Sequence, residues 1–213
     1  MKEFDKFGKH KSTVKKLIDE DDYLVTKKFY GNLSKNYKHI KYIDYFWDAY
    51  DTIKKVETPL VVITRIELFD QYEVGLNEQS NFHAVALVKD GYKFYMFDTN
   101  GICKKTDSML YVDKHGKTFY SQTFSKKYKL DLPRFRGIQY YSPKSPDGYI
   151  NDGGYCMFYT YIGVERVIQQ YLKSKTENLV ELFKKLTEKK IDFEIFFPRD
   201  IHIQSVKIVN SIF

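Results

Sequence analysis

Cys156 is the residue of this chain best placed to act as a nucleophile. It lies in the segment GGYCMFYTYIGVE, between a glycine-rich stretch and an apolar helical pattern. At the start of a helix, unpaired backbone N–H groups and the positive end of the helix dipole favour the thiolate over the thiol. The only other cysteine is Cys103. We expect Cys103 to have no role in the chemistry, although a disulfide between Cys103 and Cys156 could regulate the Cys156 thiol.

A histidine and a carboxylate are predicted to meet on a β-hairpin upstream of this cysteine. The segment NFHAVALVKDGYKFYMFDTNG consists of two apolar runs joined by Asp90-Gly91, a pair that favours a two-residue hairpin loop. With these two residues as the loop, the register places His83 directly opposite Asp98, with both side chains on one face. A carboxylate in that position can orient an imidazole that acts as a general base.

Each of the three residues also has a purely structural interpretation. A free cysteine is often a small buried apolar residue, a histidine in a strand is usually structural, and Asp98 could cap the turn that follows it. Together, however, they supply a nucleophile, a base and an orienting acid. Asn100 is an alternative orienting group, although it lies beyond the paired part of the expected hairpin.

The order of these motifs resembles that of a known superfamily. A histidine strand, a second strand ending in FDTNG, and a cysteine that begins an apolar helix after glycines are similar to the adenain and SUMO-protease superfamily of cysteine peptidases (clan CE). The likeness covers roughly residues 82–171, and GGYCMFYTYIGVE also resembles the nucleophile motif of peptidase-like proteins of large DNA viruses. The resemblance implies an α+β, adenain-like fold with a mixed central sheet.

The resemblance also implies a role for each residue. Cys156 attacks the scissile carbonyl, His83 transfers the proton, and Asp98 holds the imidazolium. The Cys156 backbone N–H and a side-chain amide form the oxyanion hole. Gln139 is the candidate amide, and Asn151 is the alternative because Gln139 precedes the cysteine by more residues than is usual in the family.

Two positions depart from the family pattern. Many members have tryptophan after the catalytic histidine, where this chain has Ala84, and many have glycine after the cysteine, where this chain has Met157. Because these positions shape the substrate cleft, the resemblance does not define the substrate.

Length and composition predict one soluble domain. The chain has 213 residues, 43% of them hydrophobic, and two cysteines. We expect a single cysteine-protease domain over residues 1–213, with a mainly helical part at 1–58, a sheet region at 59–141 and a helical part carrying the nucleophile at 156–190. With no apolar run long enough to span a bilayer and no signal-peptide pattern, we expect no membrane contact and an intracellular, reducing location, in a host cytoplasm or a virion. We expect a monomer without metal or organic cofactor.

Several local elements can be predicted. Apolar spacing indicates helices over residues 13–20, 43–53 and 156–171, and the β-branched run at 59–69 indicates a buried strand. Residues 174–177 (SKTE) have capping-box spacing before another amphipathic helix. The terminal segment FEIFFPRDIHIQSVKIVNSIF should dock on the core, as either strand or helix.

The expected function is a cysteine endopeptidase, and three alternatives stay open. The peptidase could mature viral capsid or core precursors, where the net charge of +7 would favour nonspecific contact with packaged DNA. It could instead cleave conjugates of ubiquitin-like modifiers. Related bacterial effectors use the same triad for acetyl transfer. The fourth hypothesis is a non-catalytic, basic nucleic-acid-binding virion protein.

Overall fold

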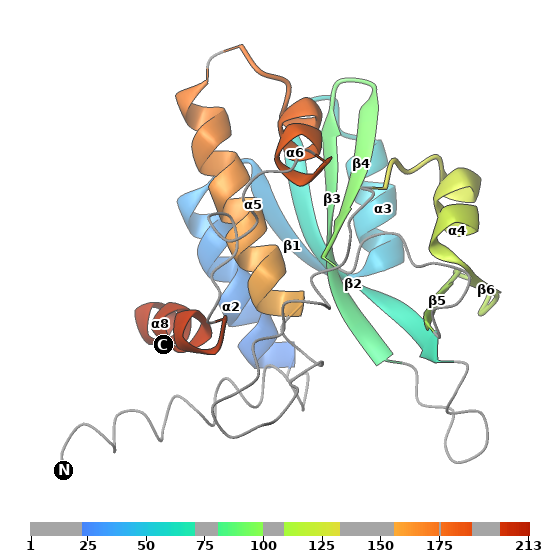
Figure 1. Cartoon of the computed structure of the whole chain (residues 1–213), viewed down its shortest axis with the longest axis horizontal. Helices are drawn as coiled ribbons and strands as arrows, with labels where there is room; N and C mark the ends of the chain where they lie inside the picture. The colour runs from blue at the N-terminus through green and yellow to red at the C-terminus, as the bar shows by residue number, and fades with distance from the viewer. Residues whose placement is uncertain (1–22, 71–80, 100–108, 133–155, 175, 189–200) are drawn as a thin grey trace.

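The computed structural model describes residues 23–70, 81–99, 109–132, 156–174, 176–188 and 201–213 (Figure 1). In chain order the elements are α2 (Tyr23–Asn36), β1 (Ile40–Tyr45), α3 (Phe46–Lys54), β2 (Leu60–Asp70), β3 (Asn81–Asp90), β4 (Lys93–Asp98), β5 (Met109–Val112), β6 (Thr118–Phe119), α4 (Ser121–Tyr128), α5 (Cys156–Lys173), α6 (Leu179–Glu188) and α8 (Ile201–Ile212). This arrangement is α+β, as the sequence predicted.

The strands form one six-stranded mixed sheet around β2. The path through the sheet is β4-β3-β2-β5-β6, and its pairs are antiparallel, whereas β1 pairs with β2 in parallel. The 11-residue β2 has β3 along one edge, and β1 followed by β5 along the other. The apolar, β-branched start of β2 suits a strand that is buried on both faces. Its predicted bounds, 59–69, agree with the observed ones to within one residue.

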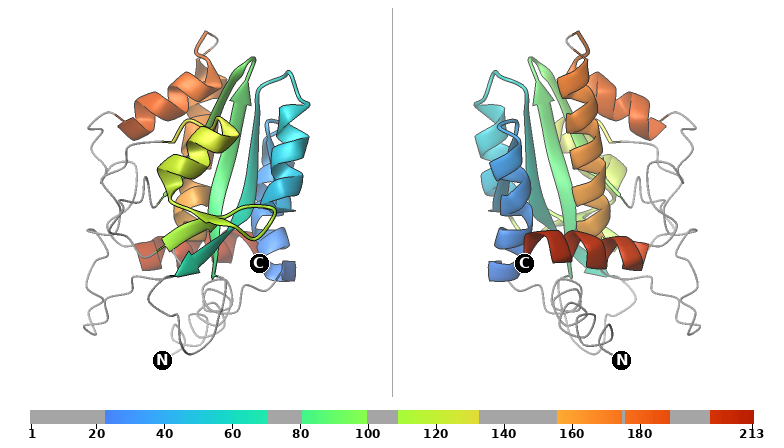
Figure 2. Two further views of the ribbon diagram at one scale, coloured as in Figure 1. Left: turned by 90° about the vertical axis from the view of Figure 1, so that its right-hand side faces the viewer. Right: turned by 90° about the vertical axis from the view of Figure 1, so that its left-hand side faces the viewer.

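Helices cover both faces of the sheet (Figures 1 and 2). One face packs against α2, α5, α6 and α8, and the other against α3 and α4. Alternate residues of β3 divide between the two cores: Ala84, Ala86 and Val88 belong to the first, and Val85 and Leu87 to the second. The near-continuous apolar sequence of β3 follows from this burial on both sides.

The β3–β4 hairpin forms, but its loop differs by one residue from the prediction. The loop consists of Gly91 and Tyr92, because Asp90 pairs with Lys93. Gly91 takes a positive φ of 60°, which glycine adopts without steric cost. Asp90 has another role, since its carboxylate accepts a hydrogen bond from the Leu179 N–H at 2.6 Å.

The new loop shifts the hairpin register by two residues. Asp98 lies opposite Val85, so the prediction that it lies directly opposite His83 was wrong. Because side chains alternate with a period of two, a shift of two keeps both side chains on the same face. His83 and Asp98 therefore become diagonal neighbours, still within reach of each other.

One other predicted element needs correction, and one is resolved. The helix predicted over 43–53 begins only at Phe46, because the residues from Ile40 to Tyr45 pair with β2 as a strand. The part predicted as mainly helical, 1–58, thus also contains β1. The helix predicted over 13–20 lies outside the described residues. The described end of the terminal segment is helix α8.

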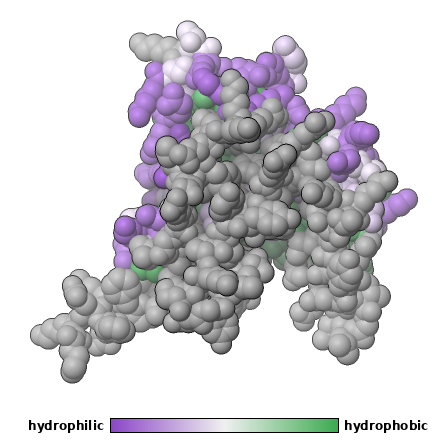
Figure 3. Space-filling view, viewed as in Figure 1, coloured by the Kyte–Doolittle hydropathy of each residue, from purple (hydrophilic) through white to green (hydrophobic). Residues whose placement is uncertain are grey.

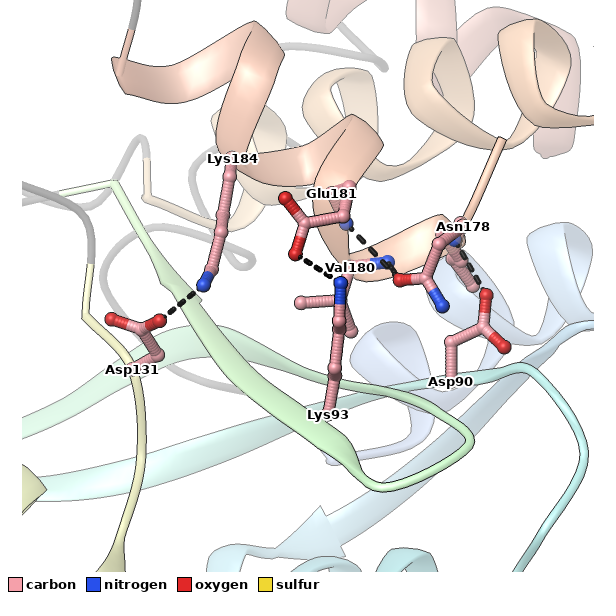
Figure 4. A network of polar contacts seen from close by, with 8 residues as sticks. Asp90, Lys93, Asp131, Asn178, Val180, Glu181 and Lys184 are labelled. Carbon is pink, nitrogen blue, oxygen red and sulfur yellow. Dashed lines mark hydrogen bonds and ion pairs between the residues drawn. The ribbon is translucent and has the colours of Figure 1, made fainter. Parts of the chain in front are cut away.

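The start of α6 is held by residues that the capping-box pattern did not indicate (Figure 4). Asn178 is the N-cap, since its Oδ1 accepts hydrogen bonds from the N–H groups of Val180 and Glu181 at 3.1 and 3.3 Å. Lys93 on β4 pairs with Glu181 at 2.7 Å. The predicted cap at Ser174 was wrong, because α5 continues to Lys173 and the next described helix, α6, begins at Leu179. These contacts fix α6 against the hairpin.

The described residues on the face seen in Figure 3 are mainly hydrophilic, with small hydrophobic areas between them. Among the described residues, no helix combines the length and hydropathy needed to cross a bilayer.

We expect Asn178→Ala to lower the free energy of unfolding by about 1 kcal/mol, because two backbone N–H groups lose their acceptor. Ser174→Ala is the matched control and should change it by less than about 0.5 kcal/mol. Urea unfolding measures both variants. A larger loss of unfolding free energy for Ser174→Ala than for Asn178→Ala would show that Ser174 caps the helix after all.

Candidate active site

The candidate site lies where β3 extends past the end of β4. β4 ends at Asp98, opposite Val85, whereas β3 begins four residues earlier at Asn81 and stays paired with β2 there. His83 belongs to this extension. Its Nε2 lies 2.7 Å from Asp98 Oδ1, and both side chains are almost fully buried. The carboxylate therefore contacts the imidazole at hydrogen-bonding distance, as an orienting group would.

Helix α5 brings Cys156 to the same place. The cysteine is its first residue and is partly exposed. Its thiol hydrogen-bonds with His83 and accepts a hydrogen bond from the Ala84 backbone N–H. Since Asp98 occupies Nε2, Nδ1 is the ring nitrogen that remains for the sulfur. The imidazole thus lies between the carboxylate and the thiol.

A second contact one helical turn further on holds α5 against β3. Thr160 Oγ1 donates to the Ala84 carbonyl at 3.2 Å, and both groups are buried. In a strand, the N–H and C=O of one residue point to the same side. Both polar groups of Ala84 therefore face α5 past the end of β4, one bonded to Cys156 and the other to Thr160. This positions the sulfur relative to the strand that carries His83.

Helix α2 supports the start of α5 from behind. Tyr30 is fully buried, and its hydroxyl donates to the Met157 carbonyl at 3.0 Å. Its neighbour Phe29 packs edge-on against Phe158 with ring centroids 5.2 Å apart. These contacts restrain the first turn of α5, which carries the thiol.

The charges at the site favour an ion pair. Burial raises the pKa of the Cys156 thiol, but the positive charge of His83 and hydrogen bonds from His83 and the Ala84 N–H outweigh it, so the net pKa is lowered. Burial lowers the pKa of His83, but the charges of Asp98 and Cys156 and hydrogen bonds to both raise it to about 10. The helix dipole acts on the thiolate in the same direction. Because the pKa of the imidazole is raised and that of the thiol is lowered, the thiolate–imidazolium pair is favoured over the neutral pair.

Several residues considered in the sequence lie outside the described part of the chain: Gln139, Asn151, Asn100 and Cys103. Both candidate oxyanion donors and the alternative orienting group thus stay predictions. Sequence reasoning missed Thr160 and Tyr30, and a threonine one turn after the cysteine was the available signal.

The described residues contain no cluster of three or more His, Cys, Asp or Glu side chains suited to a metal ion. Comparison of the chain with family models, with curated proteins and with solved structures finds no match. The interpretation of the site thus depends on its geometry and on the resemblance of its motifs.

Asp98→Asn should slow alkylation of Cys156 by iodoacetamide at neutral pH by roughly tenfold or more, because the amide no longer raises the pKa of His83. Asn100→Ala is the comparison variant and should have a smaller effect. Intact-mass spectrometry gives the rates. If Asn100→Ala has the larger effect, the orienting role belongs to Asn100.

Proposed function

We propose that this protein is a cysteine endopeptidase that hydrolyses peptide bonds through a thioester acyl-enzyme. The observation that carries the proposal is the contact of a buried His83–Asp98 pair with the thiol of Cys156, a partly exposed residue at a helix start. These parts match the roles of base, orienting acid and nucleophile. The likeness to the adenain and SUMO-protease superfamily gives the same assignment.

The proposed reaction has two halves. The Cys156 thiolate attacks the peptide carbonyl carbon, forming a C–S bond, and the oxyanion accepts hydrogen bonds from the Cys156 backbone N–H and from a side-chain amide. The C–N bond then breaks while the His83 imidazolium gives its proton to the leaving amine. In the second half His83 takes a proton from water, the hydroxide attacks the thioester, and the carboxylic acid and free thiolate are released. Asp98 keeps the imidazole oriented throughout.

Exposed lysines along α2 and the start of β1 support a viral maturation role. Residues 23–41 contain five lysines and no aspartate or glutamate. All five are exposed, and α8, which contacts α2, adds Lys207. Such a surface suits nonspecific contact with packaged DNA. We therefore propose capsid or core precursors as the protein substrates. The lysines concerned are Lys27, Lys28, Lys35, Lys38 and Lys41.

A structural role explains this arrangement less well. A buried histidine and carboxylate could stabilise the fold, but that role does not require a neighbouring thiol with a lowered pKa. The helix start beside the pair is where a thiolate is stabilised.

The test is cleavage of a library of cellular peptides, followed by mass spectrometry. The wild-type protein should generate new peptide termini, and Cys156→Ser should lose the activity by about 10³-fold or more. The rate should rise with pH through the lowered pKa of Cys156 and fall again through the raised pKa of His83, because catalysis needs the thiolate and the imidazolium together.

The matched control is Ser211→Ala, an exposed hydroxyl on α8, which should leave cleavage unchanged. An absence of cleavage by the wild-type protein, or equal cleavage by Cys156→Ser, would contradict the proposal. Transfer of an acetyl group from acetyl-coenzyme A without any cleavage would instead indicate the acetyltransferase hypothesis.

A further inference from the structure

Phe82 is a large apolar side chain exposed beside the candidate site. It directly precedes His83 on β3, and 48% of its surface is exposed, whereas His83 is 4% exposed. Along β3 it lies on the same face as Ala84, whose backbone contacts α5. Its ring is therefore on the face that α5 covers, close to the end where α5 begins with Cys156.

The ring of Phe82 is held in place by a charged group that is itself neutralised. The guanidinium of Arg65 on β2 lies over the ring at 5.0 Å from the centroid. Arg65 also pairs with Asp44 at 2.7 Å, and Asp44 accepts a hydrogen bond from the Tyr42 hydroxyl at 2.7 Å. The Arg65 guanidinium thus holds the ring in place, and the Asp44 carboxylate on β1 balances its charge.

These contacts connect the Phe82 ring to the nucleophile. Tyr42 stacks on Tyr30 with ring centroids 5.2 Å apart. Tyr30 in turn donates to the carbonyl of Met157, the residue after the cysteine. A ring fixed through this set of contacts has little conformational entropy to lose when a ligand covers it.

The backbone at Phe82 favours an extended ligand. Alternate residues of a strand direct their N–H and C=O groups to the same edge, so those of Phe82 point to the edge where Ala84 meets α5. Among the described residues, no strand pairs with this edge beyond Val85. An extended peptide can add to such an edge through main-chain hydrogen bonds, with side-chain subsites giving specificity.

We propose that Phe82 forms the floor of a subsite that takes an apolar side chain of an extended peptide substrate. This inference rests on the proposed peptidase function and adds a residue that determines specificity. An apolar side chain fits because covering an exposed ring gains free energy in proportion to the apolar area removed from water. The Asp44 carboxylate balances the guanidinium and leaves it little net attraction for an acidic side chain.

The probes are acetyl-trialanine vinyl sulfone and its variants with leucine at each position in turn. These reagents bind as short peptides and add covalently to a thiolate, so they report the subsite without requiring hydrolysis. We expect the wild-type protein to react about tenfold faster with one leucine reagent than with the trialanine reagent. Phe82→Ala should abolish that preference, and Phe82→Leu should keep most of it.

Two controls separate the subsite from the thiol. Iodoacetamide, which has no peptide part, should alkylate wild type and Phe82→Ala at the same rate. Tyr92→Ala removes an exposed aromatic residue at the tip of the hairpin and should keep the leucine preference.

The proposal is overturned if wild type shows no leucine preference at any position, or if Phe82→Ala retains it. Failure of the peptidase proposal looks different, because the peptide library then stays uncleaved while the vinyl sulfone rates can still be compared.

Discussion

The contact between His83 and Asp98 is the interaction on which the site depends. A buried carboxylate is costly unless it is paired, and a buried imidazolium is equally costly alone. At 2.7 Å the two compensate each other. In this weakly polar setting their attraction is stronger than it would be in water, which keeps the imidazole protonated and lets it stabilise the Cys156 thiolate.

Much of the surrounding fold can be understood as holding this pair and the thiol together. Helix α6 packs Phe183 against Phe97, the residue before Asp98, with centroids 5.6 Å apart. Asp90 and Lys93 fasten the same helix to the hairpin. The result is a rigid hairpin on one side of the site and a helix start, anchored by two elements, on the other.

The sequence predicted the α+β class, the β-branched strand, the hairpin and the helix that begins at Cys156. The meeting of His83 and Asp98 was predicted from a register that was wrong by two residues. The two side chains still meet because an even shift in register keeps them on the same face of the sheet. A register wrong by one residue would have placed the two side chains on opposite faces of the sheet.

Other features depend on contacts between distant segments, which local patterns do not encode. The capping-box prediction was wrong because Asn178 and the distant Asp90 accept the hydrogen bonds of the backbone N–H groups at the start of α6. The role of Thr160 requires knowing that β3 extends past β4. The same extension exposes Phe82 beside a buried histidine, and alternation alone could not indicate that.

The most direct test of the central claim is the pH–rate profile of Cys156 alkylation, compared between wild type and His83→Ala by intact-mass spectrometry. The ion pair predicts a wild-type thiol that reacts below the ordinary pKa of cysteine and faster than Cys103. It also predicts that His83→Ala moves the profile to higher pH, because the imidazolium no longer stabilises the thiolate. A wild-type profile with an ordinary thiol pKa, unchanged by His83→Ala, would contradict the account.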